Sequence, residues 1–125
     1  MKKITATLIL SVSLAALLYW YLNLPTAKAV SFNQRLWIEA SSLDKENDPG
    51  CYRGGMAMEL VEKHLLNGKT VPELISLIGV PSNSSSGSWT YPVGQCGMLW
   101  EHFHLRVDIG SEGKAIGAAV VKDDR

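Results

Sequence analysis

The chain has 125 residues, which is enough for one folded domain but not for two. The first 29 residues carry three lysines and no acidic residue (+3), so the remainder, with nine basic and twelve acidic residues, carries −3. A basic nucleic-acid-binding face is therefore not expected. A hydrophobic content of 46% excludes a disordered chain, and a count of two cysteines excludes a disulfide-dense fold.

An uncharged apolar segment covers residues 4–24 and follows Lys2 and Lys3. About 20 apolar residues in a helix span a hydrocarbon core of ~30 Å, so this segment is long enough for a membrane anchor. The alternative is a signal peptide over residues 1–29, because an A-x-A cleavage motif ends at Ala29. Both interpretations send the rest of the chain across a membrane, which predicts a domain on the periplasmic side of a bacterial cell envelope.

Residues 30–52 have mixed strand and helix character, and we expect an arm and a polar loop that pack on the domain through Phe32, Leu36 and Trp37. The domain is expected over residues 53–125. Its first helix is predicted over residues 53–66, where apolar side chains recur at helical spacing. The predicted inward stripe consists of Ala57, Leu60, Val61, His64 and Leu65, with Glu59, Glu62 and Lys63 outside it.

A second helix is predicted over residues 71–78. Thr70 is a suitable N-cap for this helix, because its side chain can accept from the backbone N–H of Glu73 while the Glu73 side chain reaches back. A proline is tolerated in the first turn, and Gly79 ends the helix. The inward positions are Val71, Leu74, Ile75 and Ile78.

The second half of the chain predicts strands. Residues 82–88 are rich in serine and read as a loop. Strands are expected over residues 89–93, 99–109 and 115–122, with a hairpin turn between the last two. The predicted fold is α+β: two helices packed on one face of a three-stranded antiparallel meander (ααβββ), preceded by the N-terminal apolar helix.

The domain resembles a known family over residues 53–122. The motifs that carry the resemblance are Gly68-Lys69-Thr70-Val71-Pro72-Glu73-Leu74, Leu77-Ile78-Gly79-Val80-Pro81, Trp89-Thr90-Tyr91-Pro92-Val93-Gly94, and Leu105-Arg106-Val107-Asp108-Ile109 with Gly113. On these motifs the chain resembles the SmpA/OmlA family, which includes the BamE-type lipoproteins, and the ααβββ layout is similar to that of the β-lactamase inhibitor protein repeats. The resemblance implies protein binding in the envelope, as an assembly accessory or an inhibitor, with no catalytic residue. The chain departs from the BamE type because it has no lipid-bearing cysteine after the apolar run.

Cys51 and Cys96 are the two cysteines. In an oxidising compartment such a pair predicts one disulfide, and two unpaired thiols are the alternative. A small thiol- or metal-dependent enzyme that uses Cys96 with His102 or His104 is the competing functional hypothesis. Two histidines supply two zinc ligands where a site needs three or four, so we predict no metal, no cofactor and no catalytic residue.

The long predicted strand alternates between two faces. Phe103, Leu105, Val107 and Ile109 point to the core, and the opposite face carries Trp100, His102, His104 and Arg106. Tryptophan and arginine are common interface anchors, so these four residues are the predicted partner-binding site, with a solvated sheet face as the alternative. The predicted function is a non-enzymatic interaction or assembly-accessory module whose partner is an envelope protein of unknown identity, with residues 4–24 contacting the membrane if they are not cleaved.

Overall fold

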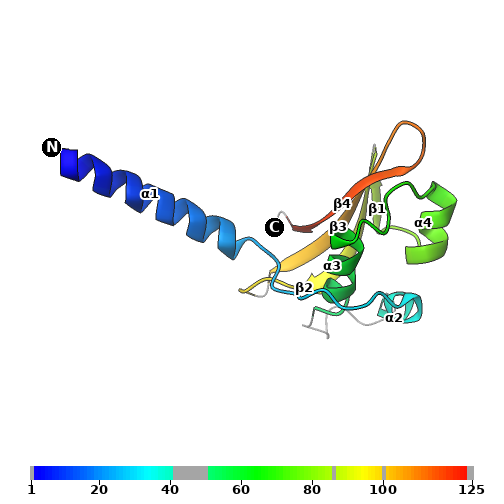
Figure 1. Cartoon of the computed structure of the whole chain (residues 1–125). Helices are drawn as coiled ribbons and strands as arrows, with labels where there is room; N and C mark the ends of the chain where they lie inside the picture. Colours follow the sequence, from blue (N-terminus) through cyan, green and yellow to red (C-terminus); the bar gives the residue numbers. More distant parts are fainter. Residues whose placement is uncertain (1, 41–50, 86, 100, 124–125) are drawn as a thin grey trace.

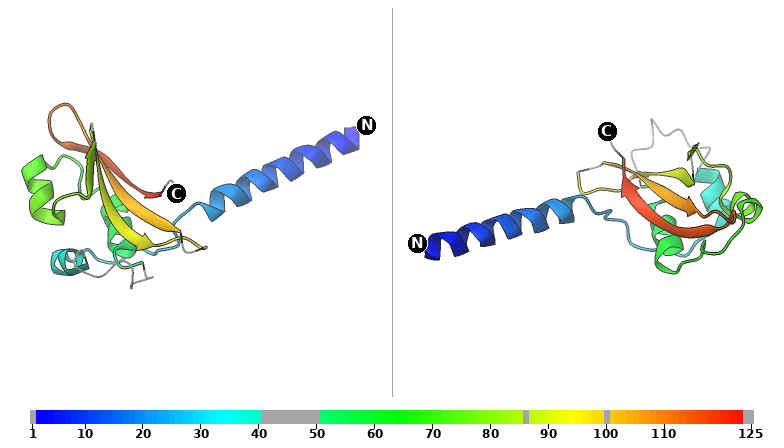
Figure 2. Two further views of the ribbon diagram at one scale, coloured as in Figure 1. Left: turned by 180° about the vertical axis from the view of Figure 1, so that it is seen from behind. Right: turned by 90° about the horizontal axis from the view of Figure 1, so that it is seen from above.

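The computed structural model describes residues 2–40, 51–85, 87–99 and 101–123. It is an α+β protein with an N-terminal apolar helix, as predicted. The elements follow in the order α1 (Lys2–Leu22), α2 (Gln34–Ala40), α3 (Gly54–Glu62), α4 (Val71–Ile78), β1 (Asn83–Ser85), β2 (Ser88–Gln95), β3 (His102–Ile109) and β4 (Ala115–Lys122). Helix α1 extends away from the domain, whose sheet carries α3 and α4 on one face (Figures 1 and 2).

The sheet has four antiparallel strands in the order β1-β2-β3-β4. The predicted three-stranded meander corresponds to β2, β3 and β4, and it lacks β1. The extra strand, β1, lies in the segment that was predicted to be a loop over residues 82–88. Ser82 holds this segment beside β2, because its backbone N–H and its hydroxyl both donate to the carbonyl of Thr90, at 2.9 and 3.0 Å. All three side chains of β1 are exposed, so the sequence has no apolar alternation there that would indicate a strand.

Helix α4 has the predicted bounds and the predicted cap. The backbone N–H of Glu73 donates to Thr70 Oγ1 at 3.4 Å, and the Thr70 hydroxyl donates to Glu73 Oε1 at 3.0 Å. Gly79 follows the helix with a φ of 83°, a conformation that favours glycine. Leu74 and Ile78 are buried, whereas Ile75 remains 41% exposed.

The first domain helix is shorter than predicted, since α3 ends at Glu62 and not at residue 66. His64 has a φ of 53°, which takes the backbone out of the right-handed helix. The chain then joins the sheet, because Gly68 N–H donates to Ala115 O and Ala115 N–H donates to Lys69 O, both at 2.8 Å. As a result His64 and Leu65 are exposed, contrary to prediction, and Leu66 is buried in their place.

Residues 30–40, the first part of the predicted arm, contribute more to the core than an arm would. They contain helix α2, in which Trp37 is fully buried and Leu36 is 47% exposed. Trp37 Nε1–H donates to the carbonyl of Ile78 at 2.9 Å, which joins α2 to the end of α4. The predicted polar loop over residues 41–50 lies outside the described residues.

Strand β4 has the predicted bounds, and β3 begins at His102 instead of residue 99. The predicted alternation in β3 is confirmed, because Phe103, Leu105 and Val107 are all buried. The core lies between the sheet and the helices. Its buried members are Trp37, Met56, Ala57, Leu60, Leu66, Leu74, Ile78, Tyr91, Val93, Cys96, Phe103, Leu105, Val107 and Ala115.

Strand β2 contains a β-bulge. Pro92 pairs with His104 and Gly94 pairs with Phe103, so Val93 is an extra residue in this strand. Side chains alternate between the two faces of a sheet, and one extra residue reverses the faces of all residues that follow it. The bulge therefore turns Cys96 toward the helix-covered face, where it is 1% exposed.

Candidate functional site

The predicted partner-binding residues that the structure describes lie on the open face of the sheet. Arg106 lies in register between Thr90 on β2 and Ala119 on β4. His104 lies between Pro92 and Val121 on the same face. Trp100 lies outside the described residues. The helices cover the other face. The left view of Figure 2, taken from behind, looks onto the open face.

Two acidic side chains pair with the basic groups of this face. His104 Nδ1 donates to Asp123 Oδ1 at 2.6 Å, which leaves the imidazole 20% exposed. Arg106 Nε lies 3.3 Å from Asp108 Oδ1, and both side chains are about two-fifths exposed, at 42% and 40%. We call Thr90, His102, His104, Arg106 and Asp108 the open face. It is a polar surface on which His104 and Arg106 each lie beside a carboxylate.

The predicted disulfide is confirmed. Cys51 and Cys96 are bonded, with their Cα atoms 4.9 Å apart, and the bond closes a loop across 45 positions. In this form Cys96 has no free thiol, so the hypothesis of a thiol-dependent enzyme lacks its nucleophile. Within the described ranges, no three His, Cys, Asp or Glu side chains are close enough together to hold a metal ion.

The segment that follows α1 is bound to the domain beside the disulfide. Thr26 donates to the carbonyl of Cys96 through its backbone N–H at 2.7 Å and through its hydroxyl at 3.0 Å. Val30 N–H donates to Gly55 O at 3.0 Å. Lys122 Nζ, at the end of β4, donates to Asn23 Oδ1 at 3.2 Å. We call residues 23–32 the junction segment, since they connect α1 to the domain by hydrogen bonds to three different parts of it.

Glu59 holds the far end of the junction segment, although its position was predicted to lie outside the inward stripe of α3. Its carboxylate accepts from the backbone N–H of Phe32 and from Lys63 Nζ, the latter at 2.8 Å, and the residue is only 8% exposed. The hydrogen bond from Lys63, together with the one from Phe32, lowers the pKa of Glu59. The same bond raises the pKa of Lys63.

Arg53 is a second buried charge that the sequence pattern did not reveal. The residue is 4% exposed, and its Nε and Nη2 donate to the carbonyl of Trp37 at 3.0 and 2.9 Å. Burial lowers the pKa of Arg53, while the nearby Tyr52 and Tyr91 act in the opposite direction. The sequence around Arg53 gave no sign of its burial, because arginine is rarely buried unless it is paired.

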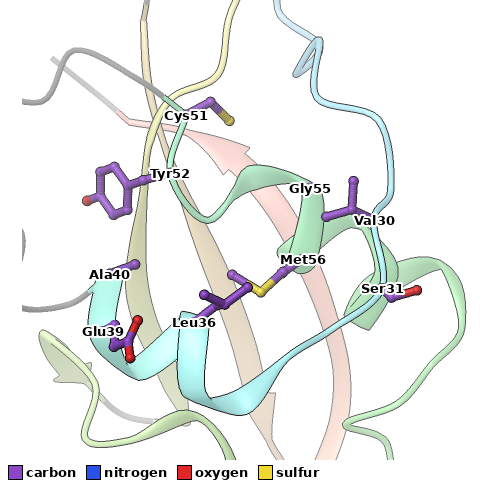
Figure 3. Close-up of a pocket in the computed structure, with 9 residues that line it drawn as sticks. All are labelled: Val30, Ser31, Leu36, Glu39, Ala40, Cys51, Tyr52, Gly55 and Met56. Carbon is purple, nitrogen blue, oxygen red and sulfur yellow. The ribbon is translucent and has the colours of Figure 1, made fainter.

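A pocket of about 510 Å³ opens beside the disulfide (Figure 3). In Figure 3 the apolar side chains of Leu36 and Met56 lie next to one another, with Val30 to the right and Cys51 above them. Ser31, Glu39, Ala40, Tyr52 and Gly55 complete the lining. Ala40 and Cys51 are the described residues on either side of residues 41–50 in the sequence. We assign no occupant to the pocket.

No protein-family model matches the chain, and no curated protein or solved structure is significantly similar to it. The resemblance to the SmpA/OmlA family therefore stays a prediction from the residues that carry it.

Proposed function

We propose that this protein is a non-enzymatic interaction module of the bacterial cell envelope, anchored by α1, with its domain on the periplasmic side and its partner site on the open face of the sheet. The observation that carries the proposal is that the junction segment joins an exposed apolar helix to a disulfide-bonded domain. The same kind of role is implied by the resemblance to the SmpA/OmlA family.

The character of α1 supports the membrane part of the proposal. Residues Lys3–Leu22 form a helix that is long and apolar enough to cross a membrane, and none of it is buried against the domain. A helix that is apolar on all sides and has no protein cover is stable only where lipid takes the place of water. The Cys51–Cys96 disulfide supports an oxidising compartment for the domain, because such bonds rarely persist in the cytosol.

The junction segment favours a retained anchor over a cleaved signal peptide. Cleavage after Ala29 would remove Asn23 and Thr26, which together make three hydrogen bonds to the domain. Ala27 is half-buried beside the start of α3, because its Cβ lies 3.1 Å from the position that a Cβ at Gly54 would occupy. The removed residues therefore contribute contacts to the folded domain, which favours their retention.

Two measurements test the location. A reporter enzyme that is active only outside the cytoplasm, fused after Arg125, is expected to be active. The intact mass of the protein extracted from membranes is expected to be that of the full chain. An active cytoplasmic-only reporter would contradict the topology, and loss of residues 1–29 would contradict the retained anchor.

The partner site is supported by the composition of the open face. Arg106, His102 and His104 combine a planar cation with two rings, and such groups recognise protein surfaces through hydrogen bonds and stacking. Asp123 holds the His104 ring in place through a hydrogen bond of 2.6 Å, which lowers the entropy lost when a partner binds.

A photoreactive amino acid placed at Thr90 tests the partner site in intact cells. This residue faces the same side as Arg106, and we expect it to form an adduct with one envelope protein. The matched control carries the photoreactive group at Glu62, an exposed position on α3 that faces away from the sheet. An Arg106→Ala change should reduce the Thr90 adduct. Equal adduct yields with and without Arg106, or from both positions, would reject the open face as the partner site.

A further inference from the structure

We propose that Met98 and Leu99, which follow β2, form a second membrane contact and are seated in the lipid interface beside the end of α1. This inference rests on the retained anchor proposed above. It assigns to the domain a fixed orientation on the membrane surface, in place of free movement at the end of a flexible tether.

The described part of the connection between β2 and β3 exposes apolar side chains. Met98 is 43% exposed and Leu99 is 69% exposed. Single exposed apolar residues occur on most proteins. Their position relative to the anchor is what distinguishes them.

Hydrogen bonds place the connection next to the anchor. Gly97 forms an antiparallel bridge with Pro25, and Cys96 O accepts from Thr26. Pro25 is three residues beyond Leu22, where α1 ends, and three residues of extended chain reach at most ~10 Å. The headgroup region on each side of a bilayer is ~5–8 Å thick. The part of the connection that pairs with Pro25 therefore lies in the headgroup region or at its outer edge once α1 spans the hydrocarbon core.

The end of α1 indicates the level of the interface. Tyr19, Trp20 and Tyr21 are exposed by 74%, 62% and 56%, and aromatic side chains of this kind gather at membrane–water interfaces. The bond from Lys122 to Asn23 brings the end of β4 to the same level. In Figure 1 the ends of β2 and β4 both lie on the side of the domain where the junction segment starts, and the hairpin between β3 and β4 lies at the opposite end of the sheet.

The test uses the full chain reconstituted into phosphatidylcholine vesicles. An environment-sensitive fluorescent amino acid replaces Leu99, which avoids a third thiol near the disulfide. The matched control carries the same amino acid in place of Glu112, an exposed residue of the distal hairpin. Before each measurement, intact mass verifies that residues 1–29 are present and that the Cys51–Cys96 bond has formed.

Spin-labelled lipid headgroups should quench the label at position 99 several-fold more than the label at position 112, and aqueous iodide should show the reverse order. Equal lipid quenching at both positions would overturn the proposal. So would protection of position 99 from iodide without lipid quenching, since this would indicate cover by protein, such as a second copy of the chain. If the variant at position 99 does not form its disulfide, the label at Met98 gives the same test. Because the mass is verified first, a negative result rejects the membrane contact and leaves the retained anchor standing.

Discussion

The guanidinium of Arg53 lies 4.3 Å from the centroid of the Trp37 ring and also donates two hydrogen bonds to the carbonyl of that residue. The ring stacking and the hydrogen bonds join the same two residues. Trp37 belongs to α2, whereas Arg53 immediately precedes α3, so this pair fastens the N-terminal part of the chain to the domain. A cation–π contact at a desolvated site contributes about 2 kcal/mol, and hydrogen bonds from a charged donor add to it.

Replacing the cation tests this pair. We expect Arg53→Met to reduce the free energy of unfolding by about 1.5–3 kcal/mol, because the buried carbonyl of Trp37 loses its donors. Chemical denaturation of the full chain in detergent micelles measures the effect. Arg35→Met is the matched control, since Arg35 is exposed on the same helix as Trp37 and should change stability by no more than ~0.5 kcal/mol. Equal losses from both variants would show that the Arg53–Trp37 contact has no special role.

The two faces of β3 should respond differently to truncation. Phe103 is 1% exposed and is part of the core, so Phe103→Ala is expected to cost about 3–5 kcal/mol. Arg106→Ala on the open face should stay within about 1 kcal/mol, because its pairing with Asp108 is largely solvated. Thermal unfolding of both variants measures the difference. A large loss of melting temperature for the Arg106 variant alone would mean that the open face is required for folding.

The disulfide should stabilise the domain strongly. The bond joins positions 45 apart, and the loss of chain entropy in the unfolded state predicts a contribution of about 4 kcal/mol. Denaturation of the oxidised protein and of the Cys51→Ala/Cys96→Ala variant measures this contribution. Similar midpoints for the two proteins would show that the bond adds little to what the core already provides.

The cost of replacing Gly54 is expected to depend on the disulfide. A Cβ at this position would collide with Cys51 Sγ and would lie 2.6 Å from Cys96 Sγ. Gly54→Ala should therefore destabilise the oxidised protein by about 1–3 kcal/mol, as overpacking does. In the Cys51→Ala/Cys96→Ala background both sulfurs are absent, and the same change should cost clearly less. A double-mutant cycle measures the difference, and equal costs in both backgrounds would contradict the assigned contact.

Glu59 should make the stability depend on pH. Its pKa is lowered in the folded protein by the hydrogen bonds from Lys63 and Phe32, so the stabilisation is present above its ordinary value of 4.5. It is lost as the pH falls below 4.5 and through the lower folded pKa, because protonation removes the charge that these donors stabilise. Denaturation at a series of pH values should show a shallower acid loss for Glu59→Gln than for the unaltered chain. Lys63→Met should also reduce the slope while keeping the bond to Phe32. If neither variant changes the slope of the unfolding free energy against pH, Glu59 is not the source of that slope.

Several features were determined by local sequence. Helix α4 has the predicted bounds because its start and end signals, Thr70 with Glu73 and Gly79, act within one turn of the residues they control. Strand β4 was also predicted, because a turn precedes it and its composition favours a strand. The alternation in β3 separated the core from the open face, since the period of a strand is a property of neighbouring residues.

Other features were decided only when distant segments came together. Cys51 and Cys96 are recognisable in the sequence as a pair, but their bond requires Cys96 to face the helices, and the bulge at Val93 provides that direction. Helix α3 ends early because residues 68 and 69 pair with the start of β4. Glu59 is buried because Phe32, 27 residues earlier in the chain, returns to it. Sequence periodicity describes which side chains share a face of one element, whereas the partner of each face depends on register and on hydrogen bonds between elements, which no local pattern contains.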